Sequence, residues 1–148
     1  MGAAGDDVSL PQRTQVCYEA WEHTGRKATS IHSSIIQIDE HGRKIEERFK
    51  SKFADASQAM HEQEVNPVDY VRTLDPIVFG CAHTFSRQLF HLFGPLPDHI
   101  IHEDNTLAFR SILAGQLLAI SEPLVRYRIH GNNVFIRQDQ RGMDLKSL

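Results

Sequence analysis

The spacing of apolar residues predicts a helix followed by a strand in the first third of the chain. Residues 11–23 carry apolar side chains at helical spacing, namely Val16, Cys17, Ala20 and Trp21. Pro11 suits the first turn of this helix, where a backbone N–H has no helical partner to lose, and Gly25 supplies a stop. Residues 28–38 are rich in β-branched side chains and predict a strand, which a glycine-containing turn at 39–42 ends.

The middle of the chain predicts helices separated by one short strand. Residues 43–63 favour a helix because apolar side chains recur there at helical spacing, namely Ile45, Phe49, Phe53 and Ala56. Residues 66–74 predict a short helix that stops before Pro76. Residues 77–79 predict an apolar strand leading into Gly80, which permits a close backbone approach, and residues 86–93 predict the next helix.

A further helix is predicted to begin with an acidic pair, Glu103 and Asp104. Its apolar face consists of Leu107, Ala108, Phe109, Ile112, Leu113 and Ala114, and its polar side of Glu103, Asp104, Asn105, Thr106, Arg110 and Ser111. The helix dipole favours negative charge in a first turn, so one interpretation is that the pair only starts the helix. However, no Lys or Arg follows Asp104 by three or four residues, so no local ion pair is expected to occupy its carboxylate.

Residues 124–130 have the two-residue period of a strand. Val125, Tyr127 and Ile129 alternate with a basic set consisting of Arg126, Arg128 and His130. One face is therefore expected to enter a core, while the other presents two guanidinium groups and an imidazole. The alternative is an edge strand whose basic face is merely solvated.

Composition narrows the function classes. The chain has 148 residues, of which 41% are hydrophobic and 24% charged, as expected of one globular domain with a core. The formal net charge of −3 argues against a general nucleic-acid-binding protein, and no apolar run is long enough to span a membrane. Cys17 and Cys81 are isolated and expected to be buried and reduced, so the default location is the cytoplasm.

Gly5, Asp6 and Asp7 form an acidic loop near the start of the sequence. Carboxylates on a glycine-containing loop can supply the oxygen ligands that Mg²⁺ or Mn²⁺ prefers. The alternative is a solvated terminal loop without a ligand. Local sequence alone does not choose between the two.

Several motifs follow one another in a fixed order: residues 80–90, residues 93–97, the Glu103-Asp104 pair, Gly115, and residues 122–125 and 127–133. Together they resemble the acceptor half of family 2 glycosyltransferases, which have the GT-A fold. The resemblance extends from Gly5 to about Asn133. It implies an α/β fold with a mixed sheet flanked by helices, in which residues 1–135 form the C-terminal portion of a GT-A domain and residues 136–148 a polar tail.

The resemblance implies an inverting glycosyltransferase that moves a sugar from a nucleotide-diphosphate sugar to a hydroxyl group. The acceptor would be a glycan or a lipid-linked molecule, as in the synthesis of bacterial surface polysaccharides, and peripheral association with a membrane is compatible with such an acceptor. The family also implies a divalent cation, Mg²⁺ or Mn²⁺, that assists departure of the diphosphate.

Family roles can be carried over to matching positions. Asp104 would accept the proton of the acceptor hydroxyl, with Glu103 beside it. The implied metal ligands are Asp6, Asp7 and His130. The implied diphosphate contacts are Asp6, Asp7, Arg128 and Arg126. The implied border of the acceptor pocket consists of Gly80, Cys81 and Ala82.

Two departures from the family pattern keep other functions open. Ala4 stands where the first Asp of the acidic motif usually falls, and the nucleotide-binding half that precedes this motif in the family has no counterpart before Asp6. These departures are compatible with a fragment of a longer protein or with a partner that supplies a separate N-terminal half. The exposed strand edges on that side are expected to be either an interface or an aggregation risk. The alternative function is a non-catalytic remnant or interaction module. A third interpretation is a metal-dependent hydrolase built on His99, His102 and Asp104.

Overall fold

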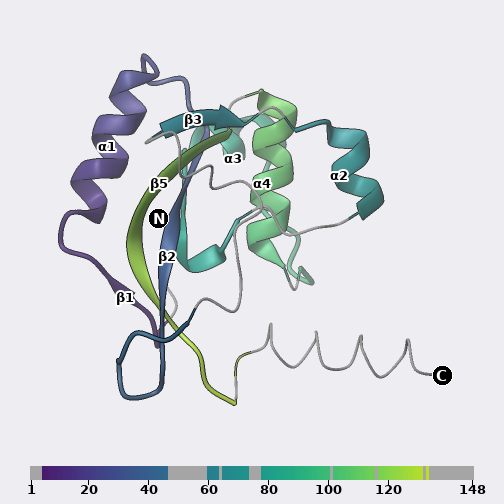
Figure 1. The fold of residues 1–148 in the computed structure, drawn as a ribbon. Coiled ribbons are helices and arrows are strands. Elements are labelled where there is room, and N and C mark those ends of the chain that lie inside the picture. The colour runs from purple at the N-terminus through teal and green to yellow at the C-terminus, as the bar shows by residue number, and fades with distance from the viewer. Residues whose placement is uncertain are drawn as a thin grey trace.

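The structure is a computed structural model that describes residues 5–46, 60–63, 65–73, 78–100, 102–115, 117–131 and 133. The described strands form one mixed sheet in the order β1-β5-β2-β4, and β3 also pairs with β5. Their bounds are β1 Val8–Ser9, β2 Ser30–Ile38, β3 Met60–Gln63, β4 His83–Phe85 and β5 Leu117–Arg128. The sequence-based prediction of an α/β fold with a mixed sheet is confirmed (Figure 1).

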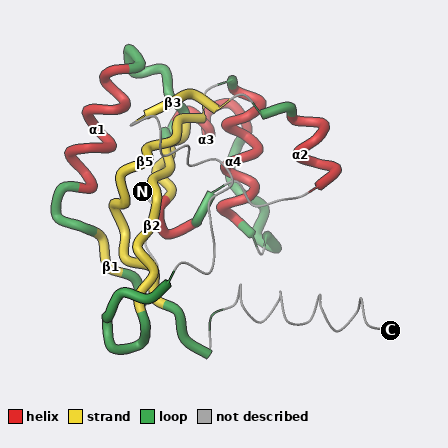
Figure 2. Tube along the Cα trace, viewed as in Figure 1, coloured by secondary structure: helices red, strands yellow, loops and turns green. Residues whose placement is uncertain are grey.

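Helices cover both faces of the sheet (Figure 2). Their bounds are α1 Arg13–His23, α2 Pro67–Thr73, α3 Gln88–Phe93 and α4 Glu103–Ala114, with a 3₁₀ helix at Gly80–Ala82. On one face, Cys17 and Ala20 of α1 pack against Ile31, Leu118 and Leu124 of the sheet. On the other face, helices α2 and α4 pack their apolar residues against Leu117. The predictions of a helix in residues 11–23 and a strand in residues 28–38 are confirmed.

Strand β5 is the central element of the sheet. It runs parallel to β2 and antiparallel to β1 and β3. The predicted strand at 124–130 is therefore longer than expected, beginning at Leu117, and it is not an edge strand. The register between β2 and β5 shifts on both sides of Ser34, which lies opposite Pro123. Such an irregularity can accommodate a proline within a sheet, because proline has no N–H to donate to the ladder.

Two predicted elements have a different conformation in the structure. Met60–Gln63 is a strand and not the end of a helix, because it pairs with Leu117–Ile120 of β5. Val78 and Phe79 do not form a strand. Instead, Ala82 N–H donates to the Phe79 carbonyl at 2.8 Å and closes the 3₁₀ helix that precedes β4. Residues 43–46 are not helical either, because Lys44 forms an antiparallel bridge with Ile38 and the Ile45 N–H donates to the Gln37 carbonyl at 3.0 Å. Residues 47–59 of the helix predicted at 43–63 lie outside the described residues, as do Ala4, Leu74, Ile77 and the tail 136–148.

The buried face of α4 also differs from the predicted one. Arg110 and Ser111, assigned to the polar side, are buried, whereas Leu113 is 49% exposed. Arg110 can enter the interior because its guanidinium donates to the carbonyls of Gly94 and Pro95, at 2.7 and 3.0 Å. Because of these tertiary hydrogen bonds, the face of α4 that is buried differs from the face that the hydrophobic pattern predicts.

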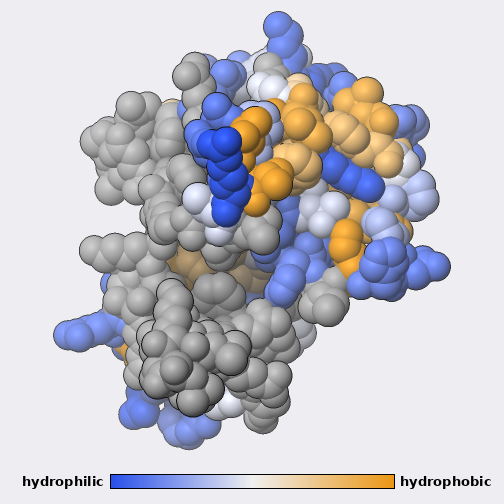
Figure 3. Space-filling model, turned by 90° about the vertical axis from the view of Figure 1, so that its right-hand side faces the viewer, coloured by the Kyte–Doolittle hydropathy of each residue, from blue (hydrophilic) through white to orange (hydrophobic). Residues whose placement is uncertain are grey.

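Apolar side chains gather on the side of the molecule that carries α2 and α4 (Figure 3). The exposed large apolar residues of the helices on this side are Val68, Val71, Leu92, Phe93 and Leu113. No helix among the described residues is both long and apolar enough to cross a membrane.

Candidate functional site

The N-terminal acidic loop lies beside the end of β5. Strand β1 pairs antiparallel with β5, Val8 opposite Arg126, so the residues before Val8 lie next to those after Arg126. This pairing brings Asp6 to His130, with 2.7 Å between Asp6 Oδ2 and His130 Nε2. The hydrogen bond from His130 lowers the pKa of Asp6, so Asp6 is ionised at neutral pH.

Asp7 is held more deeply than Asp6. Its Oδ1 accepts a hydrogen bond from the backbone N–H of Arg128 at 2.7 Å. Burial raises its pKa, and the thiol of Cys81 lies against the carboxylate. Its second oxygen, Oδ2, is buried and has no nitrogen or oxygen donor among the described residues. Asp7 therefore combines a fixed position with a buried carboxylate oxygen that has no N–H or O–H donor among the described residues.

Arg128 connects two loops to the end of β5. Its Nε donates to the Asp6 carbonyl at 2.9 Å, and its Nη1 donates to the carbonyls of Asp39 and Glu40 at 3.0 and 2.8 Å. These bonds leave Nη2 as the donor nitrogen not engaged by the described residues. Arg128 thus positions the acidic loop. Arg126 lies on the same face of β5 but is exposed.

Asn133 fixes the backbone that carries His130, a role the sequence did not reveal. Its Oδ1 accepts the backbone N–H of His130 at 2.6 Å, and its Nδ2 donates to the Arg128 carbonyl at 2.9 Å. Asn133 is 8% exposed. The available signal was the position of Asn133 within the matched motif at 127–133, since an Asn that bridges two backbone groups is typical of a fixed loop.

The second acidic group lies at the start of α4. Asp104 Oδ1 accepts the backbone N–H of Asn105 at 2.8 Å, within the first turn of the helix. Burial raises the pKa of Asp104, and the charge of Glu103 adds to the rise, so the carboxylate is a stronger base than an exposed Asp. Glu103 itself is exposed. The predicted acid pair thus separates into one half-buried and one solvated carboxylate.

The 3₁₀ helix at Gly80–Ala82 joins the two acidic groups. A Cβ placed on Gly80 would lie 3.0 Å from Asp104 Oδ2, so any other residue here would have to push the Asp104 carboxylate away by a few tenths of an ångström. The next residue, Cys81, lies against Asp7. The predicted close approach at Gly80 is therefore confirmed. Cys81 and Ala82 are buried with Val125, which places them behind the carboxylates as support.

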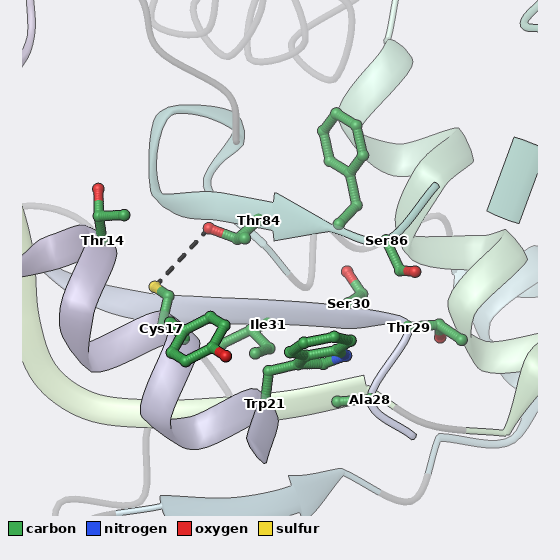
Figure 4. Close-up of a pocket in the computed structure, with 11 residues that line it drawn as sticks. Thr14, Cys17, Trp21, Ala28, Thr29, Ser30, Ile31, Thr84 and Ser86 are labelled. Atoms are coloured by element: carbon green, nitrogen blue, oxygen red, sulfur yellow. Dashed lines mark hydrogen bonds between the residues drawn. The ribbon is translucent and has the colours of Figure 1, made fainter. Parts of the chain in front are cut away.

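The candidate metal ligands include one close pair among the described residues, Asp6 and His130. Among the described ranges, no three His, Cys, Asp or Glu side chains gather into a metal-holding group. His99, His102 and Asp104, all described, form no such group either. Two of the cavities among the described residues, of about 300 and 500 Å³, lie beside α1, and none of the predicted site residues lines either of them; Figure 4 shows the smaller one.

Neither protein-family models nor curated proteins give a match. Functional assignment of the site therefore rests on its geometry and on the motif resemblance.

Proposed function

We propose that the chain contributes the metal, diphosphate and acceptor side of a glycosyltransferase with a GT-A fold, and that it takes part in sugar transfer from a nucleotide-diphosphate sugar to a hydroxyl group. One observation carries the proposal. Asp6 and His130, 124 residues apart, are 2.7 Å from each other. The motif resemblance joins these two residues at one metal, and the fold places them together through the pairing of β1 with β5.

The chemistry of the cluster fits a divalent cation. Carboxylate oxygens and imidazole are accepted ligands of Mn²⁺, and Mg²⁺ is commonly held by one or two carboxylates together with substrate phosphates and water. Asp6 is ionised, and the Asp7 Oδ2 atom is buried without an N–H or O–H donor. The small number of protein ligands therefore agrees with an ion that binds together with a diphosphate. When bound, the cation would offset the negative charge of the departing diphosphate.

The chain's own residues would act around this cluster in three ways. The backbone and guanidinium of Arg128 hold Asp7 and the acidic loop in place, and the Nη2 of Arg128 offers one charged donor to a phosphate. Asp104 would accept the proton of the attacking hydroxyl, since its raised pKa favours proton uptake. Gly80 keeps the Asp104 carboxylate at its position by leaving room for it.

Manganese binding tests the cluster directly. Free Mn²⁺ is measured by electron paramagnetic resonance while the chain is titrated, alone and with UDP or GDP. We expect one diphosphate to strengthen Mn²⁺ binding, and Asp6→Asn and His130→Gln each to weaken it by at least about tenfold. Asp98→Asn is the matched control, because Asp98 is exposed in a turn. Equal Mn²⁺ binding by Asp6→Asn and Asp98→Asn would refute the site.

A second measurement tests the reaction apart from the metal. The nucleotide sugar whose base gives the strongest Mn²⁺-dependent binding is incubated with the chain, and water is the attacking hydroxyl that takes the sugar. Release of the nucleoside diphosphate by this hydrolysis is followed. Asp104→Asn is expected to bind Mn²⁺ and the diphosphate normally but to release product at least about a hundredfold more slowly. Normal product release by this variant would remove Asp104 from the role of base.

A further inference from the structure

The carboxylate of Asp39 stabilises the turn that follows β2. Its Oδ1 accepts the backbone N–H groups of His41 and Arg43, both at 2.9 Å. The backbone closes the same turn, since the Gly42 N–H donates to the Asp39 carbonyl at 3.0 Å and Gly42 has a positive φ of 83°. Asp side chains favour turns because they accept hydrogen bonds from the backbone a few residues further along. One carboxylate oxygen thus fixes the conformation of residues 39–43.

The other carboxylate oxygen of Asp39 makes an ion pair at the surface. Asp39 Oδ2 lies 2.8 Å from Arg43 Nε, and the Arg43 side chain is 75% exposed. Exposed ion pairs contribute little to stability, because water and salt screen them. The hydrogen bond from the backbone of Arg43 is the largest cause of the lowered pKa of Asp39. The backbone contacts of Asp39 are therefore expected to matter more for the turn than its ion pair.

The turn directs two successive carbonyls at one nitrogen of Arg128. The Nη1 of Arg128 donates to the carbonyls of Asp39 and Glu40, at 3.0 and 2.8 Å. In an extended chain successive carbonyls point to opposite sides, so a turn is needed for both of them to reach one nitrogen. The orientation of the guanidinium group therefore depends on the conformation that Asp39 fixes.

The same guanidinium group reaches the acidic loop. The loop after β2 lies beside β1 and the end of β5 (Figure 1), and the Nε of Arg128 donates to the Asp6 carbonyl at 2.9 Å. Because the guanidinium group is planar and rigid, the two bonds at Nη1 also fix the direction of Nε. The carboxylate of Asp6 in turn lies 2.7 Å from His130. A single side chain, that of Arg128, thus connects the turn to the residue that carries a candidate metal ligand.

We propose that Asp39 is a positioning residue for the Asp6–His130 cluster. Its carboxylate fixes the turn at 39–43, the turn orients the guanidinium group of Arg128, and this group holds the acidic loop beside His130. The consequence for metal binding rests on the proposed function. The chain of hydrogen bonds from Asp39 to the Asp6 carbonyl does not, so the two can be tested separately.

Three variants separate the two oxygens of the Asp39 carboxylate. Asp39→Ala removes the acceptor of both backbone N–H groups. Asp39→Asn keeps a side-chain oxygen that can accept them and loses the ion pair. Arg43→Gln also loses the ion pair and leaves the contacts of Asp39 with the backbone in place. The proposal predicts that Asp39→Ala differs from the other two variants, which should resemble the wild-type chain.

Hydrogen exchange of the Arg128 Nε–H, followed by NMR on the metal-free chain, tests the positioning. We expect this exchange to be at least about fivefold faster in Asp39→Ala and within about twofold of the wild-type rate in Asp39→Asn and Arg43→Gln. The amide of Leu118, where β5 pairs with β3, should exchange at the wild-type rate in all three variants. Unchanged Nε–H exchange in Asp39→Ala, or equal acceleration in all three variants, would overturn the proposal. Equal acceleration of the Leu118 amide would show general destabilisation and would overturn it as well.

Manganese binding tests the consequence for the site. Free Mn²⁺ is measured by electron paramagnetic resonance in the presence of UDP or GDP. We expect Asp39→Ala to weaken Mn²⁺ binding by at least about fivefold, and Asp39→Asn and Arg43→Gln to stay within about twofold of the wild-type chain. If Asp39→Ala binds Mn²⁺ as the wild-type chain does, the proposal is wrong although the metal site stands. If the wild-type chain binds no Mn²⁺ with either diphosphate, the proposed function fails, and the Nε–H exchange of Arg128 still decides whether Asp39 positions the acidic loop.

Discussion

The contact between Gly80 and Asp104 allows a quantitative test of how the site is packed. In Gly80→Ala, the new methyl group would lie 3.0 Å from Asp104 Oδ2, 3.2 Å from its Cβ and 3.4 Å from its Cγ. Gly80 is not among the glycines with positive φ, so the substitution adds no backbone strain and its cost is steric. Overpacking of this kind costs about 1–3 kcal/mol, of which the reduced entropy of the unfolded chain offsets about 0.4–1 kcal/mol.

We therefore expect Gly80→Ala to lower the free energy of unfolding by about 0.5–2 kcal/mol in urea denaturation. Gly131→Ala is the matched control, because a Cβ there meets nothing within 4 Å and its φ is not positive. Without a steric cost, this substitution should raise the free energy of unfolding by up to about 1 kcal/mol, through the entropy of the unfolded chain alone. Asp104→Ala removes Oδ2 and Cγ and leaves only the 3.2 Å contact. In that background, Gly80→Ala should lower the free energy of unfolding by at least about 0.5 kcal/mol less than it does when Asp104 is present.

The double-mutant cycle decides the outcome. A coupling energy of at least about 0.5 kcal/mol between positions 80 and 104 is expected, since the two residues are in direct contact. A neutral or stabilising Gly80→Ala, or the same cost with and without the Asp104 carboxylate, would refute the reasoning. Either result would show that the first turn of α4 does not lie against the 3₁₀ helix as described.

Three further predictions concern His83, the two cysteines and Arg128. Burial lowers the pKa of His83 to about 3, so below about pH 6.5 this histidine binds a proton in the unfolded chain but not in the folded one. In urea denaturation, the free energy of unfolding should therefore fall by up to about 3 kcal/mol from pH 7 to pH 4. The fall should be smaller in His83→Asn. Burial raises the pKa of both Cys17 and Cys81, so iodoacetamide should modify neither thiol in the native chain but should modify both in denaturant. Rapid labelling of the native chain, measured by mass spectrometry, would contradict this prediction. Arg128→Lys should lower the free energy of unfolding by about 1–3 kcal/mol, because Lys cannot reproduce the hydrogen bonds to three carbonyls. Arg126→Lys, at an exposed position, should be nearly neutral. Equal urea midpoints for these two variants would argue against the loop-holding role of Arg128.

Local sequence predicted the elements whose boundaries depend on local chemistry. The helix at 11–23 and the strand at 28–38 follow from apolar spacing, a proline at the first turn and turn-forming glycines. The structure starts them at Arg13 and Ser30, shifts of two residues that the fraying of helix and strand ends makes ordinary. Gly80 was correctly expected to permit close approach, although the approaching residue, Asp104, was not named.

Tertiary pairing decided what local pattern could not. Met60–Gln63 is a strand because β5 offers it a partner, and Arg110 is buried because the carbonyls of Gly94 and Pro95 accept its hydrogen bonds. The sequence nominated Asp6, Asp7 and His130 through their chemical types and the motif resemblance. That Asp6 meets His130, and that Arg128 mainly holds the loops, depends on the antiparallel pairing of β1 with β5 across 124 residues. The sequence by itself determined which groups are available and which short segments are helical or extended. Only the tertiary structure decided which groups meet, because hydrogen bonds and close contacts between distant residues depend on their separation in space and not along the chain.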